Sequence, residues 1–449
     1  MRSAATTKRH QTQALPSAAP TTAPLPARAR VASLFTGIGG IELGLHRAGF
    51  EPDGLRLACE IDPGARAILA TRFGARPRLH QDVQELIALD GADLVTAGFP
   101  CQDLSQAGLT EGIGGPKSGL VNEVFRLLAA SKRKGKAPRW VLFENVPFML
   151  RLQSGRAMRR VVAGFEELGY RWWAYRVLDA IHFGLPQRRR RVFFLASRSP
   201  DDDPRSVLFD PPAPIGKPRV LEHVDPERAK CFGFYWTEGN RGLGWATEAL
   251  PTLKGGSGLG IPSPPAIWFR DTDEFVTPGI ELAERVQGFP PGWTSVESVD
   301  FKENARWLYV GNAVPVAVAE WVGKRLLAPV TVADGGIQFD TAEHGSWPNA
   351  AYGRDGEAFE AREQLEGPPE SRRQLLSKLP ILTREKRARH VRPLSIRAAQ
   401  GVYTRLLRAQ EEGRLRPRED FMAALRKYVE THPERRLLPK SARSSASRR

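Results

Sequence analysis

The sequence predicts an α/β fold with an open, mainly parallel sheet that is covered by helices on both faces. Between residues 31 and 200, short apolar segments alternate with longer segments whose apolar residues recur at helical spacing, as in successive β–α–β units. Glycine-rich or polar residues follow several of the apolar segments, at the edge where such sheets bind ligands. These two observations together predict the fold class.

The elements follow in chain order. "RVASLF" predicts a strand, and "GIELGLHRAGF" predicts a helix in which Ile41, Leu45 and Ala48 share one face. "GLRLACE" predicts a second strand, and "DPGARAILATRF" a helix with Asp62 as its N-cap. Further strands are predicted in "DLVTAGF", "WVLFENV" and "RVFFLAS", with helices in "GLVNEVFRLLAASK" and "RAMRRVVAGFEELGY".

Composition divides the chain into further parts. Residues 1–30 contain Ala, Thr, Pro and Arg but no acid, which predicts a disordered leader. Residues 31–200 and 281–330 are assigned to the α/β domain, and the Gly- and Pro-rich residues 201–280 to a small irregular domain. Residues 331–449 predict an acidic linker followed by a basic, partly helical C-terminal extension.

The net charge of +16 is unevenly distributed, because residues 371–449 contain 22 Lys and Arg against 7 Asp and Glu. Such a balance favours a nucleic-acid partner, and the alternative is a basic proteome with solvated faces. In this tail, apolar faces around Leu406 and Leu425 predict helices whose arginines contact phosphate. The alternative is a helical pair that packs on the α/β domain. On the phosphate hypothesis, deleting the tail leaves the recognised sequence unchanged.

Cysteine usage and hydropathy exclude several classes of protein. Three cysteines, at 59, 101 and 231, fit neither a zinc knuckle nor a disulfide framework, and they indicate a reducing cytosol. No segment approaches the roughly 18 apolar residues of a membrane span. We therefore expect no metal, no membrane association and a cytoplasmic protein.

The first two strand ends indicate a nucleoside pocket. "FTGIGG", Phe35 to Gly40, would let backbone amides approach a ligand at a helix N-terminus. Its spacing fails the dinucleotide fingerprint because Glu42 stands where the third glycine belongs. Glu60, at the tip of the second predicted strand, is placed to bind ribose hydroxyls. Asp82 lies on the adenine side of this pocket or caps a helix.

Three further polar sites follow or precede apolar strands. Cys101 has Pro, Gln, Asp and Ser neighbours, which favour a ligand loop over the alternative of a buried thiol acting as a small hydrophobe. Glu144 is either a capping group or a catalytic acid. Gln187 and alternate arginines precede a core strand, so a merely solvated basic run is disfavoured. A thiol, a carboxylate and an arginine beside a nucleoside pocket predict covalent catalysis on an electron-poor ring.

From about Ala32 to Leu327 the chain resembles the cytosine-5 DNA methyltransferases of bacterial restriction–modification systems. Six segments resemble the family's motifs and occur in its order: "FTGIGG", "GFPCQDLSQAG", "FENV", "QRRRRVF", "RVQGFPPGW" and "GNAVPVAV". The resemblance implies a Rossmann-like, S-adenosylmethionine-dependent methyltransferase sheet, with the target-recognition domain in residues 201–280. It also implies methyl transfer to carbon 5 of a cytosine that is flipped out of duplex DNA.

The resemblance assigns roles to individual residues. Cys101 corresponds to the nucleophile and Glu144 to the group that hydrogen-bonds ring nitrogen 3 and the amino group. Arg189 and Arg191 correspond to the residues that orient the base and help to ionise the thiol. The positions that match the cofactor pocket are Phe35, Gly37, Gly39, Gly40, Glu60, Ile61, Asp82, Pro100, Asn312 and Val314. The expected DNA contacts are Gln102, Ser105, Gln187, Arg241, Thr252 and Lys254.

Two other functions remain as alternatives. An RNA (tRNA) cytosine-5 methyltransferase has the same scaffold, but its nucleophile motif usually continues Cys-Phe-Thr, where this chain has Cys101-Gln102-Asp103. A catalytically silent DNA-binding relative is disfavoured by the intact Cys101, Glu144 and Gln-x-Arg-x-Arg element. We expect a bacterial monomer that is associated with the nucleoid through duplex DNA, either solitary or paired with a separate restriction endonuclease.

Overall fold

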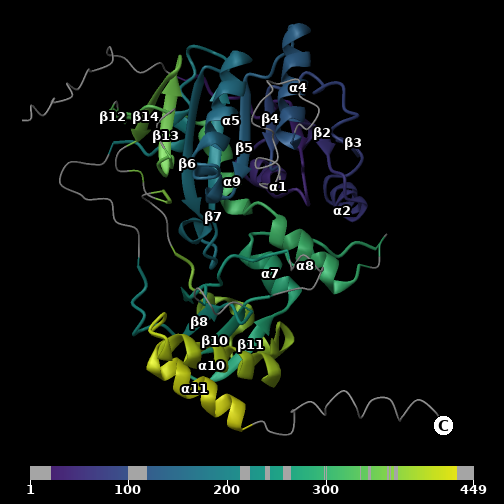
Figure 1. Ribbon diagram of the computed structural model, residues 1–449. Coiled ribbons are helices and arrows are strands. Elements are labelled where there is room, and N and C mark those ends of the chain that lie inside the picture. The colour runs from purple at the N-terminus through teal and green to yellow at the C-terminus, as the bar shows by residue number, and fades with distance from the viewer. Residues whose placement is uncertain are drawn as a thin grey trace, which may run out of the picture.

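The computed structural model describes residues 22–99, 119–212, 223–237, 243–255 and 264–431, apart from positions 298, 300, 334, 342–344, 362, 363, 365 and 369–372. The described residues form two lobes, each built around one sheet (Figure 1). The large lobe contains a 10-stranded sheet, and the small lobe contains a 5-stranded sheet. In this part of the chain no helix is long and apolar enough to cross a membrane.

One half of the large sheet is parallel, as the sequence predicts. Its strands lie in the order β3-β2-β1-β4-β5. The chain order therefore reverses between β1 and β4, and ligands bind at such a switch point in open α/β sheets. The bounds are β1 Val31–Leu34, β2 Leu55–Cys59, β3 Arg78–His80, β4 Leu94–Ala97 and β5 Trp140–Asn145.

The other half is antiparallel, so the expectation of a mainly parallel sheet is wrong. Strands β7 and β6 continue the sheet beyond β5, and β13, β14 and β12 follow them. The expected linker at the start of residues 331–449 is therefore also wrong, because three strands of the sheet come from this region. The bounds are β6 Trp172–Asp179, β7 Arg190–Ser197, β12 Gly336–Gln338, β13 Ala350–Arg354 and β14 Glu357–Ala361.

Helices cover both faces of the large sheet. On one face, α1 and α9 pack so closely that a Cβ atom at Gly44 would lie 2.5 Å from the Ala319 side chain. On the other face, α4 and α5 share a core with the strands. The bounds are α1 Gly40–Ala48, α2 Pro63–Phe73, α4 Leu120–Arg133, α5 Arg156–Glu167, α6 Arg205–Leu208, α7 Ile280–Val286, α8 Glu303–Asn312 and α9 Val316–Leu327.

The expected disordered leader is wrong for residues 22–30. Leu25 and Ala29 are buried in the core that contains α9, and the Leu25 amide donates to the Leu326 carbonyl at 2.9 Å. The Thr22 hydroxyl accepts a hydrogen bond from the Asp203 amide at 2.8 Å. Apolar burial and paired backbone groups hold this segment in place. Residues 1–21 lie outside the described part.

The small sheet is antiparallel and combines two distant regions of the chain, in the order β15-β11-β10-β8-β9. Four strands come from the predicted irregular domain, and β15 comes from the C-terminal extension. Helices α10 and α11 cover this sheet (Figure 1). The bounds are β8 Cys231–Phe234, β9 Ala246–Thr247, β10 Ala266–Phe269, β11 Glu274–Pro278, β15 Val391–Pro393, α10 Ile396–Glu411 and α11 Glu419–Glu430.

The helices of the tail are present, with Leu406 and Leu425 fully buried, but they pack on the small sheet. The alternative that they pack on the α/β domain is therefore wrong. Phe421 lies among the rings of Phe234, Trp245 and Trp268, which face it edge-on at 5.0 to 5.4 Å between ring centroids. The extension therefore completes the core of the small lobe.

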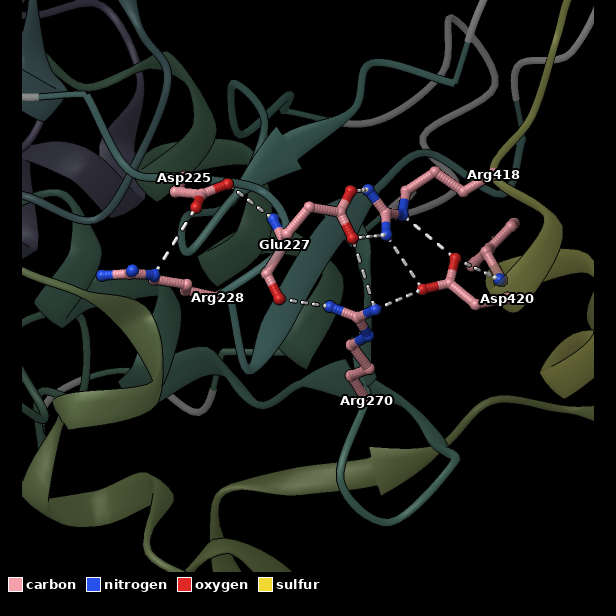
Figure 2. A network of polar contacts seen from close by, with 7 residues as sticks. Asp225, Glu227, Arg228, Arg270, Arg418 and Asp420 are labelled. Atoms are coloured by element: carbon pink, nitrogen blue, oxygen red, sulfur yellow. Dashed lines mark hydrogen bonds and ion pairs between the residues drawn. The ribbon is translucent and has the colours of Figure 1, made fainter.

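An ion-pair network closes the rim of this contact (Figure 2). Arg418 donates to both carboxylate oxygens of Glu227, at 2.8 and 3.2 Å, and it also binds Asp420 at 3.0 Å. Arg270 reaches the same Asp420 at 3.0 Å.

Short 3₁₀ helices occur at Pro52–Gly54, Pro147–Leu150, Ala180–Phe183, Leu376–Lys378, Pro380–Leu382 and Arg387–Arg389.

Candidate active site

The strand register brings the predicted site residues to one edge of the large sheet. Leu34 of β1 pairs with Ala97 of β4, and Ala97 pairs with Phe143 of β5. Parallel strands end at the same edge, so Phe35, Gly98 and Glu144 follow these pairs at a common level. The ligand-binding edge that the sequence predicts is therefore formed by the expected segments.

The turn between β1 and α1 needs its glycines. Phe35, Gly37 and Gly39 all have positive φ, at 55°, 59° and 83°. A Cβ atom at Gly39 would lie 2.4 Å from the Phe73 ring, and one at Gly40 would lie 2.5 Å from the Val314 carbonyl oxygen. In the described chain, a Cβ atom at Gly37 would meet no heavy atom within 4 Å. The turn is therefore packed on two sides and open at Gly37.

Glu60 connects this turn to the tip of β2. One of its carboxylate oxygens accepts from the Gly37 amide at 2.7 Å, and the other accepts from the Asp62 amide at 2.9 Å. The neighbouring Ile61 side chain is 65% exposed. A fixed carboxylate beside an exposed apolar side chain suits a ligand with hydroxyl groups and a flat ring.

The remaining predicted cofactor residues differ in how far the structure describes them. Asp82 follows β3, whose last residue pairs with the last residue of β2, so it lies near Glu60. Its carboxylate accepts from the Gln84 amide at 2.9 Å and caps a turn rather than a helix. Asn312 ends α8 and is exposed, whereas Val314 contacts the glycine turn. Pro100 lies outside the described residues.

Glu144 and Arg191 form a buried ion pair. Their closest atoms, Oε1 and Nε, are 2.9 Å apart, and the two side chains are only 10% and 12% exposed. Burial raises the pKa of Glu144, and the positive charges of Arg191 and Arg189 oppose that rise. A carboxyl group with a raised pKa retains its proton to a higher pH than usual, as a catalytic acid requires.

Asn145 ties the end of β5 to the segment that precedes the predicted nucleophile. Its side-chain amide donates to the Phe99 carbonyl oxygen at 3.0 Å, while its own oxygen accepts from the Val146 amide. Phe99 stands two residues before Cys101. Cys101, Gln102 and Ser105 lie outside the described residues, but the start of their segment is held beside Glu144.

The expected DNA contact of Gln187 is wrong in this arrangement. The side chain is fully buried, and its amide nitrogen donates to the Val286 carbonyl oxygen and the Gln287 side chain, both at 3.1 Å. Its oxygen accepts from the Leu253 amide at 2.9 Å. Because both ends of the amide are used inside the protein, Gln187 connects the lobes instead of reading DNA.

Arg189 has a similar structural position. Its guanidinium donates to the Leu253 carbonyl oxygen at 3.0 Å and to the Ala313 carbonyl oxygen at 2.8 Å. The side chain is 1% exposed, so the expected direct contact of Arg189 with the base is corrected. Its charge still acts on Glu144, and Arg191 is the arginine that pairs with that carboxylate.

Two of the predicted base readers, Thr252 and Lys254, lie on the loop that follows β9. The Thr252 hydroxyl donates to the Arg188 carbonyl oxygen at 2.6 Å, which leaves its lone pairs as acceptors. Lys254 is exposed, and its ammonium lies 4.2 Å from the centroid of the Tyr235 ring. Arg241 lies outside the described residues. This loop therefore lies next to the segment that carries Arg189 and Arg191.

Three residues of this junction were not predicted from the sequence as site residues in their own right: Asn145, Gln287 and Tyr235. Asn145 follows Glu144 directly, so its position at a strand end was a usable signal. Gln287 lies within "RVQGF", in a helical segment that also contains Glu281, Glu284 and Arg285, so its polarity alone did not indicate a buried contact. Tyr235 carried no such signal either.

Among the described residues, no group of three or more His, Cys, Asp or Glu could hold a metal ion.

Comparison with known proteins identifies the family. Residues 29–223 match the C-5 cytosine-specific DNA methylase family. The type II methyltransferase M2.BsuMI of Bacillus subtilis (strain 168) is 48% identical over 332 residues, which cover 72% of this chain and 81% of that protein. The type II methyltransferase M.FnuDI of Fusobacterium nucleatum is 29% identical over 347 residues, or 67% of this chain and 95% of that protein.

Among solved structures, S. pombe Dnmt2 methyltransferase aligns over 67% of this chain and 98% of its own, with 18% identity and a TM-score of 0.48. The relationship to M2.BsuMI extends over most of both chains, and the matched family segment contains the glycine turn, Glu144 and Arg191. The chain therefore belongs to the C-5 cytosine-specific DNA methylases and is a DNA cytosine-5-methyltransferase.

Proposed function

We propose that this enzyme methylates a cytosine that has been flipped out of duplex DNA, through a covalent adduct with Cys101. The observation that carries the proposal is the junction of β4 and β5. Asn145 holds Phe99 beside the Glu144–Arg191 pair, so the segment that begins there starts next to a buried carboxyl group. A stacked base cannot reach a buried site of this kind, which supports base flipping.

The reaction divides into addition, transfer and elimination. The Cys101 thiolate forms a bond to carbon 6 of the cytosine, and the ring electrons move to carbon 5. S-adenosylmethionine would supply the methyl group: its methyl–sulfonium bond would break as the bond to carbon 5 forms, and S-adenosylhomocysteine would leave with the electron pair. A base then removes the carbon 5 proton, and the electrons of that bond restore the ring double bond as the Cys101 thiolate leaves.

Glu144 acts on the ring before and during addition. A protonated carboxyl group donates to ring nitrogen 3 and makes carbon 6 more electrophilic, while its other oxygen accepts from the amino group. The raised pKa of Glu144 supports this role because it keeps the proton available. Arg191, whose Nε lies 2.9 Å from Oε1 of Glu144, positions the carboxyl group and limits how far its pKa rises.

The residues at the end of β1 and β2 fit S-adenosylmethionine. The glycine turn offers backbone amides and an open side at Gly37, Glu60 offers a fixed carboxylate for ribose hydroxyls, and exposed Ile61 offers an apolar surface for the adenine. Asp82 and Val314 complete the same edge. Binding of S-adenosylmethionine by the Glu60→Ala variant, measured by calorimetry, tests this assignment.

Cys101→Ser tests the nucleophile. The hydroxyl has a far higher pKa than the thiol, so methylation should disappear while S-adenosylmethionine binding persists. Methylation is measured by bisulfite sequencing of duplex DNA, and the adduct is measured by trapping on a duplex that contains 5-fluorocytosine. Cys231→Ala is the matched control and should remain active, because Cys231 of β8 is a buried thiol that packs in the cluster shared with α2, α7 and α8. A serine variant that retains turnover would refute the assignment.

We also propose that the small lobe chooses the DNA sequence and that Thr252 and Lys254 face the base edges. The curated relatives are named type II methyltransferases, which supports sequence-specific methylation within a restriction–modification system. We expect a cytoplasmic monomer bound to the nucleoid, with a cognate endonuclease that acts separately. Bisulfite sequencing of a library of duplexes reveals the recognised sequence, and activity on tRNA in place of DNA would contradict the substrate assignment.

A further inference from the structure

Four consecutive arginines, Arg188 to Arg191, lead into β7, and they bind partners of two kinds. Arg189 donates to two backbone carbonyl groups at the junction of the lobes, and Arg191 pairs with Glu144. Arg188 and Arg190 stand at the alternate positions, where an extended chain directs its side chains to the opposite side. The proposed site involves Arg189 and Arg191 only, so the other two arginines need a separate explanation.

Two carboxylates bind these other arginines. The Nε atom of Arg188 donates to one oxygen of Asp179 at 2.9 Å, and the second oxygen of Asp179 accepts from the Arg189 amide at 2.8 Å. Asp179 is fully buried at the end of β6. Arg190 forms an ion pair with Glu366, which comes after β14. Acids from two distant regions therefore hold the arginine segment through residues that the proposed site does not use.

Glu366 projects from a backbone that is anchored on the large lobe. Its carbonyl oxygen accepts from the Asp179 amide at 2.8 Å. The carbonyl oxygen of the next residue, Gly367, accepts from the fully buried guanidinium of Arg176 at 3.0 Å. A Cβ atom at Gly367 would overlap the His182 side chain, so only glycine packs this closely. The Glu366 carboxylate is therefore presented to the arginine segment from a fixed position.

Arg190 and Arg191 lie where β7 has only one neighbouring strand. The ladder between β5 and β7 ends at the pair Asn145–Val192 and includes neither arginine. The ladder between β6 and β7 ends at Arg190, one pair beyond Arg191. Strand ends open more readily than strand interiors. A contact that holds Arg190 therefore also limits the movement of Arg191 away from Glu144.

We propose that Glu366 is a positioning residue for the reaction, because it keeps the start of β7, and with it Arg191, in place against Glu144. This inference rests on the proposed function. Residues 29–223 match the methylase family, so Glu366 lies outside the matched segment. The C-terminal region thus supports the chemical step in the large lobe, in addition to completing the core of the small lobe.

The position of Arg191 affects the ionisation of Glu144. Burial raises the pKa of Glu144, and among the described residues the charges of Arg191 and Arg189 oppose that rise. A looser arginine segment would weaken this opposition, so the pKa of Glu144 would rise further while its carboxyl group lost a fixed direction. The proposed reaction needs the protonated carboxyl group, so its deprotonation sets the pH at which activity falls on the alkaline side.

Glu366→Gln removes the charge and keeps the size of the side chain. We expect kcat at the pH optimum to fall about fivefold, the upper scale for a partly exposed ion pair. The alkaline midpoint of the pH profile should move to higher pH, while S-adenosylmethionine binding and the recognised sequence stay unchanged. Arg190→Gln should give the same loss, and the double variant no larger one, because each change removes the same contact. Methyl transfer from tritiated S-adenosylmethionine to duplex DNA measures these rates.

Asp355→Asn is the matched control. Asp355 forms an ion pair with Arg171 beyond the other end of β6, and Asn tolerates its positive φ of 52°. Both Asp355→Asn and Glu366→Gln should change the melting temperature by only a few degrees. The control should leave kcat and the alkaline midpoint as they are in the wild-type enzyme.

Two results would overturn the proposal. One is a lower kcat of Glu366→Gln without a shift of the alkaline midpoint, since Glu366 would then have a merely structural role. The other is a variant with wild-type kcat and pH profile. Failure of the proposed function gives a different result, because Glu144→Gln should abolish methyl transfer. If Glu144→Gln retained both its activity and its alkaline midpoint, the proposed role of Glu144 would be refuted, and this inference with it, whatever the Glu366 variant does.

Discussion

The two lobes obtain their cores in different ways. The parallel half of the large sheet is built from consecutive β–α units between Val31 and Asn145, so each strand packs on elements close to it in sequence. The small sheet joins residues 231–278 to a strand at Val391–Pro393, more than a hundred residues later. Local patterns therefore describe the first core, whereas the second exists only when distant segments meet.

The dependence on distant segments is strongest in the aromatic core of the small lobe. Of its fourteen buried cluster residues in the described chain, eight belong to the extension, so neither part contains a complete core alone. The extension supplies Leu394, Ala398, Ala399, Val402, Leu406, Phe421, Ala424 and Leu425. A tail that looks like an appendage in sequence is therefore the second half of the small lobe.

Deletion of residues 371–449 should produce the largest effect. Each large buried side chain that is lost costs about 2–5 kcal/mol, and their sum exceeds the roughly 5–15 kcal/mol that stabilises a domain. We expect the small lobe to unfold and sequence-specific methylation to disappear. Limited proteolysis and bisulfite sequencing measure the two outcomes. A truncated protein that still methylates the same sequence would support the phosphate hypothesis and contradict this one.

One core substitution in each lobe should show which binding activity depends on which core. Phe421→Ala removes a fully buried ring from the small lobe, and Phe165→Ala removes one from the large lobe. Each should cost about 3–5 kcal/mol. Phe421→Ala should weaken DNA binding and leave S-adenosylmethionine binding intact, and Phe165→Ala should weaken both.

Calorimetric unfolding and binding titrations measure these effects, and Leu407→Ala on the exposed side of α10 is the control. If Phe421→Ala lowered S-adenosylmethionine affinity as much as Phe165→Ala, the two lobes would form a single unit.

The ion-pair network at the rim should produce the smallest effect. The Arg418 guanidinium lowers the pKa of Asp420 in the folded protein. The pair therefore stabilises the folded state fully above the pKa of an unfolded Asp, about 3.9. This stabilisation is lost as the pH falls through the lower pKa that Asp420 has in the folded state. Asp420→Asn should therefore destabilise the protein at pH 7 by about 1 kcal/mol or less, because the pair is partly exposed. The difference should vanish below pH 3.

Chemical denaturation at both pH values measures this loss, and high salt should reduce it. Glu430→Gln, at an exposed helical pair with Arg426, is the control for an ordinary surface contact. A loss that persists unchanged at low pH would show that Asp420 acts through its cap of the Phe421 amide instead of its charge.

The sequence was most informative for site residues that stand directly at the end of a predicted strand. Phe35, Glu60 and Glu144 each come immediately after an apolar segment, and parallel strands of known order bring such positions to one edge. The antiparallel half was missed because its outer strands return from residues 336–361. A local signal was present there, since Asp355 and Gly356 have φ of 52° and 88°, as expected for an Asp-Gly hairpin.

The errors about Gln187 and Arg189 have a common cause. A polar, arginine-rich segment predicts a solvent or DNA contact, but these two side chains bind backbone groups of the other elements at the junction. Burial of this kind depends on how the lobes meet, which no local pattern contains. Tyr235 was missed for the same reason, because it follows β8 whereas its neighbours Gly244 and Lys254 lie before and after β9.

The insertion of β15 at the edge of the small sheet has a consequence during synthesis. A ribosome adds about 5–20 residues per second, so the interval between Pro278 and Val391 lasts on the order of 10 s. During that time the nascent chain already contains every segment of the parallel half-sheet, while the small lobe lacks its last strand and both covering helices. Sequence choice, which we propose for the small lobe, would therefore be the last property that the newly made enzyme acquires.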